Sequence, residues 1–117
     1  MKLTNEQANA ILQFLARRAG YDGCRLHEIN GFMCCRFIKD GVEWDCELLE
    51  NSMLGSVYFY TNSYKTILES FFKNKNKVYI PSSLARHDRN ENQVIHVFQQ
   101  GDSLESLMVQ ADLENLG

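Results

Sequence analysis

The chain has 117 residues, of which 44% are apolar and 23% charged, and its formal net charge is −3. This composition is typical of a single folded domain and excludes a disordered, coiled-coil or collagen-like chain. The acidic balance disfavours a general nucleic-acid binder, because phosphate contacts need a surplus of Lys and Arg.

Targeting signals are not evident in the sequence. No apolar run approaches the length of a membrane-spanning helix, and polar residues follow Met1 almost at once. We therefore expect a cytoplasmic protein. In that reducing compartment its cysteines, Cys24, Cys34, Cys35 and Cys46, are expected to be free thiols.

The first predicted element is an amphipathic helix over residues 5–19. Thr4 and Gln7 have the spacing of a capping box, in which each side chain bonds the backbone N–H of the other residue. Gly20 suits the left-handed conformation that often ends a helix. Apolar residues recur at helical spacing between these ends, at Ala8, Ile11, Leu12, Leu15 and Ala19.

Two dipeptides, Asn30-Gly31 and Asp40-Gly41, predict tight β-hairpin turns, because both favour type I′ geometry. They define an antiparallel three-stranded meander over residues 24–29, 32–38 and 42–48. Counting away from the turns predicts the register. The expected pairs are Ile29–Phe32, His27–Cys34, Leu26–Cys35, Lys39–Val42, Ile38–Glu43, Phe37–Trp44, Arg36–Asp45, Cys35–Cys46, Cys34–Glu47 and Met33–Leu48.

Alternation along these strands separates an inner from an outer face. The inner face is expected to pack under a helix and to hold Cys24, Leu26, Met33, Cys35, Phe37, Trp44, Cys46 and Leu48.

The second half of the chain is predicted to complete an α+β domain. It consists of one antiparallel sheet with helices packed mainly on one face, in two layers. The last helix should be capped by Asp102 or Ser103, and Asp102 and Glu105 have capping-box spacing. The remaining elements are a short strand at 57–60, a helix from Tyr64 through Phe72, and paired strands at 78–80 and 94–98. We find no linker or domain boundary.

Two motifs suggest catalytic chemistry, but neither is complete. Gly101-Asp102-Ser103-Leu104 spells the signature for which a lipase and esterase family is named, yet no histidine follows it. His27 and Cys34 face each other across a strand pair, but no oxyanion donor is implied nearby, and Glu47 on the other side would raise the thiol pKa. There is no C-x-x-C pair for zinc. We therefore expect a protein that is not an enzyme and needs no cofactor or metal.

The outer face of the meander carries the strongest functional indication. It combines apolar and basic side chains that would be exposed if the helices cover the inner face alone. Such a surface is typical of contact with another protein. The candidate partner-binding residues are Arg25, Ile29, Phe32, Cys34, Arg36 and Ile38.

A predicted helix ending in Ala19-Gly20 is followed by two segments, Leu26-His27-Glu28-Ile29-Asn30-Gly31 and Arg36-Phe37-Ile38-Lys39-Asp40-Gly41. These segments and the order of the predicted elements resemble those of the class I type III secretion chaperones. The resemblance covers most of the chain as a pattern, without a specific motif. It implies a cytosolic homodimer that holds an extended segment of a client protein. No functional residue is carried over from it.

The main hypothesis is thus a non-enzymatic cytosolic protein-binding module that acts by surface complementarity. A small phage or bacterial inhibitor or immunity protein that blocks a target protein would have the same size and acidity. A nucleic-acid-binding protein is the third interpretation, and it would use the basic residues of the 73–89 region, Lys73, Lys75, Lys77, Arg86 and Arg89.

Overall fold

The computed structural model describes residues 3–29, 32–45, 47–48, 63–73, 78–81, 92–95 and 97–116. Within these ranges the elements are α1 (Asn5–Arg18), β1 (Gly23–Ile29), β2 (Phe32–Lys39), β3 (Val42–Asp45), β4 (Glu47–Leu48), α2 (Tyr64–Lys73), β5 (Val78–Pro81), β6 (Asn92–Ile95) and α3 (Leu104–Leu116). The predicted α+β class is confirmed. The strand predicted at 57–60 lies outside the described residues.

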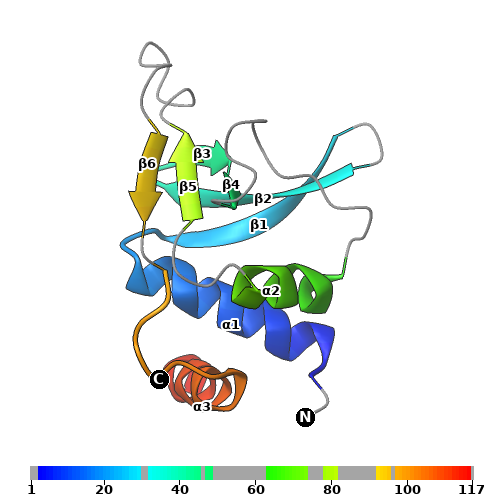
Figure 1. The fold of residues 1–117 in the computed structure, drawn as a ribbon, viewed down its shortest axis with the longest axis vertical. Coiled ribbons are helices and arrows are strands. Elements are labelled where there is room, and N and C mark those ends of the chain that lie inside the picture. Colours follow the sequence, from blue (N-terminus) through cyan, green and yellow to red (C-terminus); the bar gives the residue numbers. More distant parts are fainter. Residues whose placement is uncertain are drawn as a thin grey trace.

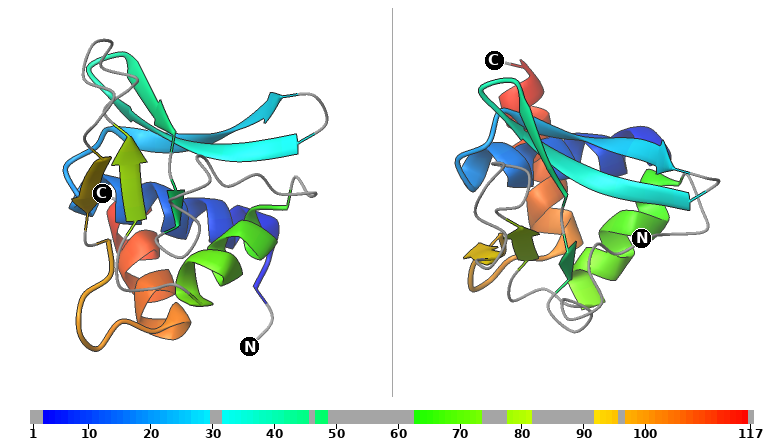
Figure 2. Two further views of the ribbon diagram at one scale, coloured as in Figure 1. Left: turned by 45° about the horizontal axis from the view of Figure 1, so that its top comes forward. Right: turned by 90° about the horizontal axis from the view of Figure 1, so that it is seen from above.

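The described strands form two antiparallel sheets. Sheet A has the order β1-β2-β3, and sheet B has the order β4-β5-β6. Helices α1, α2 and α3 all lie on the same side of sheet A (Figure 1). α1 and α2 run beneath its strands, and α3 packs against α1 farther from the sheet (Figure 2). Strand β5 of sheet B contacts β3 of sheet A.

The core forms around α1. Its predicted capping box is present: the Gln7 N–H donates to Thr4 Oγ1 at 3.1 Å and the Thr4 N–H donates to Gln7 Oε1 at 2.9 Å. After the helix, Gly20 has the left-handed φ of +96° expected of it. Four residues of the stripe predicted to face inward, Ala8, Ile11, Leu12 and Leu15, are buried together with Ala16, whereas Ala19 is half-buried at the C-cap. They share the core with Cys24, Cys35 and Phe37 of sheet A, Ile67, Leu68 and Phe71 of α2, and Leu107 and Ala111 of α3.

The predicted register is confirmed close to the turns. The pairs Leu26–Cys35, His27–Cys34 and Ile29–Phe32 join β1 to β2, and Phe37–Trp44 lies in the second hairpin. Asp40 and Gly41 have φ values of +52° and +77°, as a type I′ turn requires. Cys24, Cys35 and Phe37 are buried on the inner face, and Leu26 packs against the core. Of the other residues predicted for this face, Met33 and Trp44 have side chains outside the described part, Cys46 lies outside the described residues, and Leu48 belongs to sheet B instead.

The register prediction is wrong beyond Asp45. Glu47 and Leu48 do not face β2, because they form β4 and pair with Tyr79 and Val78 of β5. The predicted pairs Cys34–Glu47 and Met33–Leu48 are therefore absent, and Cys46 lies outside the described residues. A two-stranded ribbon is marginally stable by itself, and β4 makes sheet B three-stranded.

The chain between β6 and α3 also differs from the prediction. β6 ends at Ile95, so Val97 and Phe98 are not part of a strand. Val97 is buried instead, and its carbonyl accepts a hydrogen bond from Arg18 Nη2 at 2.8 Å. Phe98 packs edge-on against Phe72 of α2, with 4.9 Å between the ring centroids.

Ser103 caps α3, as one of the two predicted alternatives. Its Oγ accepts from the Ser106 N–H at 3.0 Å, and the Ser103 N–H donates to Ser106 Oγ at 2.9 Å. The predicted Asp102–Glu105 box is thus replaced by a Ser103–Ser106 box. Asp102 is left to bind α1: Oδ2 accepts from Arg18 Nη2 at 2.6 Å, and Oδ1 accepts from Nη1 at 3.2 Å.

This ion pair gives a testable stability prediction. Burial of Asp102 opposes its ionisation, but hydrogen bonds from Arg18 and from the Gln99 N–H outweigh it and lower the pKa of the carboxyl group. Asp102→Asn should lower the free energy of unfolding at pH 7 by about 2 kcal/mol, the scale of hydrogen bonds to charged groups. The folded-state pKa lies below the ordinary value of 3.8, so the wild-type advantage is complete above that value. It should disappear as pH falls through the folded-state pKa.

Urea denaturation between pH 2 and 7 would measure this difference. Asp112→Asn, on the exposed side of α3, is the matched control and should change the free energy of unfolding by less than about 0.5 kcal/mol. A constant difference between wild type and Asp102→Asn across that pH range would contradict the assignment.

A second polar contact joins α1 to β1. The side-chain amide of Gln13 meets both backbone groups of Cys24: the Cys24 N–H donates to Oε1 at 2.9 Å, and Nε2 donates to the Cys24 carbonyl at 2.5 Å. Nε2 also donates to Asn9 Oδ1 at 3.0 Å. We call this pairing the Gln13 clamp. A Cβ atom at Gly23 would lie 2.6 Å from Gln13 Oε1, so a side chain there forces the Gln13 amide to move.

Gly23→Ala should therefore break the clamp and lower the free energy of unfolding by about 1–2 kcal/mol. In a Gln13→Ala background the same substitution should cost less than half as much, since the obstructing oxygen is gone and alanine favours the strand over glycine. A double-mutant cycle from urea denaturation measures this coupling. Equal costs in the two backgrounds would show that the clamp does not exist in solution.

Candidate functional site

The candidate site is the outer face of sheet A, the side turned away from the helices. In the described part of the chain no helix lies over it (Figures 1 and 2). Of the predicted set, the structure brings Arg25, Arg36 and Ile38 together on this face and adds His27 and Glu43. The register places Ile29, Phe32 and Cys34 on the same face, but their side chains lie outside the described part.

Arg25 and Arg36 face each other directly across β1 and β2. Two like charges in that position repel, so a third group is needed between them. Glu43 of β3 supplies it: Arg25 Nε donates to Oε1, and Arg36 Nη1 donates to Oε2 at 3.1 Å. These three side chains, which we call the Arg–Glu–Arg cluster, carry one net positive charge.

The two arginines hold Glu43 ionised. The hydrogen bond from Arg25 is the largest influence on its pKa; burial opposes it, and the hydrogen bond from Arg36 adds to it, so the pKa of Glu43 is lowered. We predict an Arg36–Asp45 pair, and the backbones of these residues do pair. The Arg36 guanidinium, however, also reaches Glu43, one step diagonally across the strands. Glu43 is therefore a residue of the face that the sequence analysis did not single out.

The members of the face differ in exposure. The Arg25 side chain is 45% exposed, whereas that of Arg36 is 18% exposed beside Glu43 at 29%. Ile38 is half-buried. Partly buried arginines, already held in place by a carboxylate, offer guanidinium edges to a partner with little further loss of side-chain freedom.

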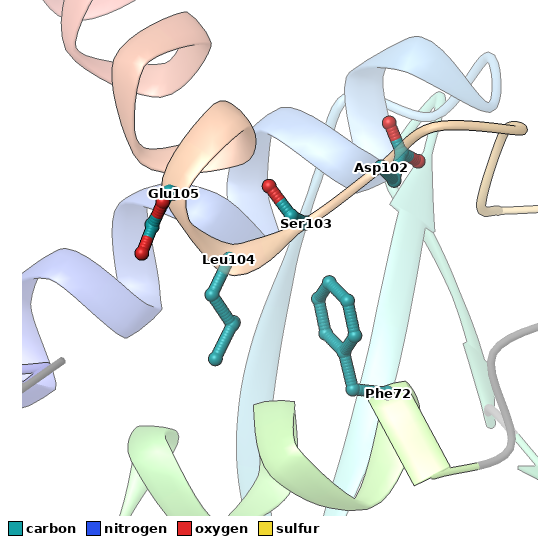
Figure 3. A pocket seen from close by; sticks show the side chains of 5 residues that line it. All are labelled: Phe72, Asp102, Ser103, Leu104 and Glu105. Atoms are coloured by element: carbon teal, nitrogen blue, oxygen red, sulfur yellow. The ribbon is translucent and has the colours of Figure 1, made fainter.

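The lipase-like motif has a structural role. Figure 3 shows Asp102, Ser103, Leu104 and Glu105 at the start of α3, around a shallow hollow of about 470 Å³ that Phe72 closes from α2. Asp102 is turned away from Phe72 and binds Arg18. The Ser103 hydroxyl caps the helix. Both polar groups of the motif are thus engaged in holding the fold.

Of the cysteines whose side chains the structure describes, Cys24 and Cys35 are buried thiols outside any disulfide. A hydrogen bond with Cys35, and then burial, raises the pKa of Cys24 well above its usual value, so this sulfur stays a thiol at neutral pH. The expected role of both as small apolar residues of the core is confirmed. His27 and Cys34 pair across the strands as predicted, but Glu47, expected beside Cys34, belongs to sheet B.

The basic 73–89 region is represented by Lys73, which is exposed at the end of α2. Lys75, Lys77, Arg86 and Arg89 lie outside the described residues. The searched residues contain no cluster of three or more His, Cys, Asp or Glu that could hold a metal ion. None of the described helices has the length and apolar character needed to cross a membrane.

Comparison with known proteins adds no family to this description. No family model matches the chain, and neither a curated protein nor a solved structure matches it significantly.

The Arg–Glu–Arg cluster predicts a salt-sensitive contribution to stability. Glu43→Gln leaves Arg25 and Arg36 opposite each other with a neutral group between them. It should lower the free energy of unfolding by about 0.5–1 kcal/mol in low salt, the scale of a cross-strand charge pair on a partly exposed face. Because the folded-state pKa of Glu43 lies below its ordinary 4.5, this contribution is present above that value. It is lost as pH falls through the folded-state pKa.

Denaturation in about 0.05 M and about 1 M NaCl tests the assignment, since the higher salt screens exposed charges within a few ångströms. Glu69→Gln on α2 is the control, because Glu69 lies 4.0 Å from Lys65 in a more exposed pair. A Glu43→Gln effect no larger than that of Glu69→Gln would rule out a bridging role.

Proposed function

We propose that this protein is a non-enzymatic protein-binding module that captures a partner protein through the outer face of sheet A. The observation that carries the proposal is the position of the helices. Because the described helices all pack on the inner side, Arg25, Arg36 and Ile38 stand on a face that no described helix covers.

The chemistry of the face supports a protein partner. Arginine is enriched at the centres of protein interfaces, where its planar group stacks and donates several hydrogen bonds. Here two arginines share one carboxylate, and the half-buried Ile38 adds apolar surface beside them. The net positive charge of the cluster favours acidic side chains on the partner.

Within this class, we propose a chaperone-like client binder that works in the cytoplasm. The support for this finer assignment is the resemblance in the order of elements, together with a sheet whose outer face offers a broad surface. An inhibitor that blocks a target protein would use the same face, and the identity of the captured partner distinguishes the two.

Ile38→Asp tests the proposal, with Phe32→Asp as a second variant of the same face. Each places a carboxylate beside apolar surface that the partner should cover, so we expect capture of the partner to fall at least about tenfold, equivalent to 1.4 kcal/mol. The measurement is affinity capture from lysate in low and high salt, with mass spectrometry of what is retained in stoichiometric amount. Light scattering gives the number of subunits.

Val109→Asp is the matched control, because Val109 is apolar and 57% exposed on α3, far from this face. It should retain the partner fully. Circular dichroism must show all three variants folded. Unchanged capture by both Ile38→Asp and Phe32→Asp would remove the outer face from consideration.

A further inference from the structure

β1 forms one edge of sheet A, so one side of its backbone faces away from β2. Along a strand, the backbone N–H and C=O of one residue point to one edge, and those of the next residue point to the opposite edge. The Gln13 clamp identifies the outward set, since Gln13 binds the N–H and C=O of Cys24. By this alternation the backbone N–H and C=O groups of Leu26 and Glu28 also point away from β2.

The Gln13 amide occupies the place that a residue of a neighbouring strand would take at Cys24. Among the described residues, it is the one group that hydrogen-bonds the outward side of β1. Farther along β1, no described residue hydrogen-bonds the outward backbone groups of Leu26 and Glu28. Within the described ranges no strand pairs with this edge, and an unpaired strand edge is a template for another extended segment.

The charges on the outer face define what that segment should carry. Across sheet A the directly paired residues run Asp45, Arg36, Arg25 from β3 to β1. The row begins with an acid and ends with two bases at the open edge. A strand added beside β1 would place one of its residues directly opposite Arg25, where an acidic side chain forms a favourable cross-strand pair with the guanidinium.

The backbone geometry favours this pairing. The backbone groups of Leu26 and Glu28 would make the hydrogen bonds to the added strand. Arg25 and His27 would then occupy the non-hydrogen-bonded positions of the new ladder, where facing side chains lie closest, with Cα atoms about 4.5 Å apart. Leu26 packs against the core on the other face, so the residue opposite it should be apolar. The matching segment therefore alternates acidic and apolar residues.

We propose that the open edge of β1, from Arg25 to Ile29, binds an extended segment of a partner protein as a fourth strand of sheet A, with an acidic residue opposite Arg25. This inference rests on the proposed function, because it presumes a protein partner. It adds the mode of recognition and the chemistry of the segment. The clamp at Cys24 sets the end of the added ladder.

The probe is a blocked peptide of about nine residues in which Glu and Val alternate, long enough for one strand. We expect it to slow hydrogen exchange at the Leu26 amide at least about tenfold when bound, because that N–H gains an acceptor. The Cys24 amide should change little, since Gln13 already protects it.

Matched peptides separate strand addition from simple charge attraction. The valine residues would face Leu26 and Glu28 and donate to β1, so N-methylation of every valine should abolish binding. N-methylation of every glutamate leaves those donors intact and should preserve it. A peptide that alternates Lys and Val should bind at least about tenfold more weakly, as repulsion from Arg25 requires.

On the protein side, Arg25→Glu should weaken binding of the Glu–Val peptide at least about tenfold, whereas Lys65→Glu on α2 should change it less than about twofold. Glu43→Gln should strengthen it, because the arginines lose their internal acid. Failure of the peptide to protect Leu26 at about 1 mM, or equal binding of the valine-methylated peptide, overturns the inference.

The same exchange measurement on the natural complex separates this inference from the proposed face. If Ile38→Asp loses the partner but Leu26 gains no protection in the wild-type complex, the outer face stands and strand addition is wrong. If Leu26 is protected and Ile38→Asp retains the partner, strand addition stands and the face is wrong.

Discussion

Burial of the apolar stripe of α1 is the constraint on which the rest of the structure depends. Ile11, Leu12 and Leu15 are almost fully buried between sheet A and the other two helices. A helix inserted in this way requires apolar neighbours on several sides: α2 supplies them beside α1 under the sheet, and α3 supplies them farther from the sheet. Sheet A is consequently covered on one face by the described helices.

Two polar joints hold α1 in that position. Gln13 binds the backbone of Cys24, and Arg18 near the end of the helix binds Asp102 and the Val97 carbonyl. Both satisfy groups that burial would otherwise leave unpaired, which is costly in a low-dielectric interior. They also involve a polar residue to which a sequence motif would assign a catalytic role: Asp102 of the lipase-like motif forms an ion pair with Arg18.

On the outer face of sheet A, by contrast, the charged side chains remain partly exposed to water. Glu43 relieves the repulsion between Arg25 and Arg36 by accepting a hydrogen bond from each. The proposed face and the proposed strand addition therefore use one arrangement. β1 presents backbone groups along its edge and basic side chains above it, and an acidic extended segment complements both.

The sequence by itself determined what depends on neighbours along the chain. The capping box of Thr4 and Gln7, the turn at Asp40 and Gly41 and the pairing of Phe37 with Trp44 follow from short spacings and local backbone preference. Tertiary structure decided where distant segments compete for the same partner: Leu48 pairs with Val78 rather than with Met33, and Asp102 binds Arg18 instead of capping α3. Glu43 and Gln13 became recognisable through the same kind of contact. Local rules describe one strand pair or helix end at a time, whereas the free energy of these contacts depends on which segments folding brings together.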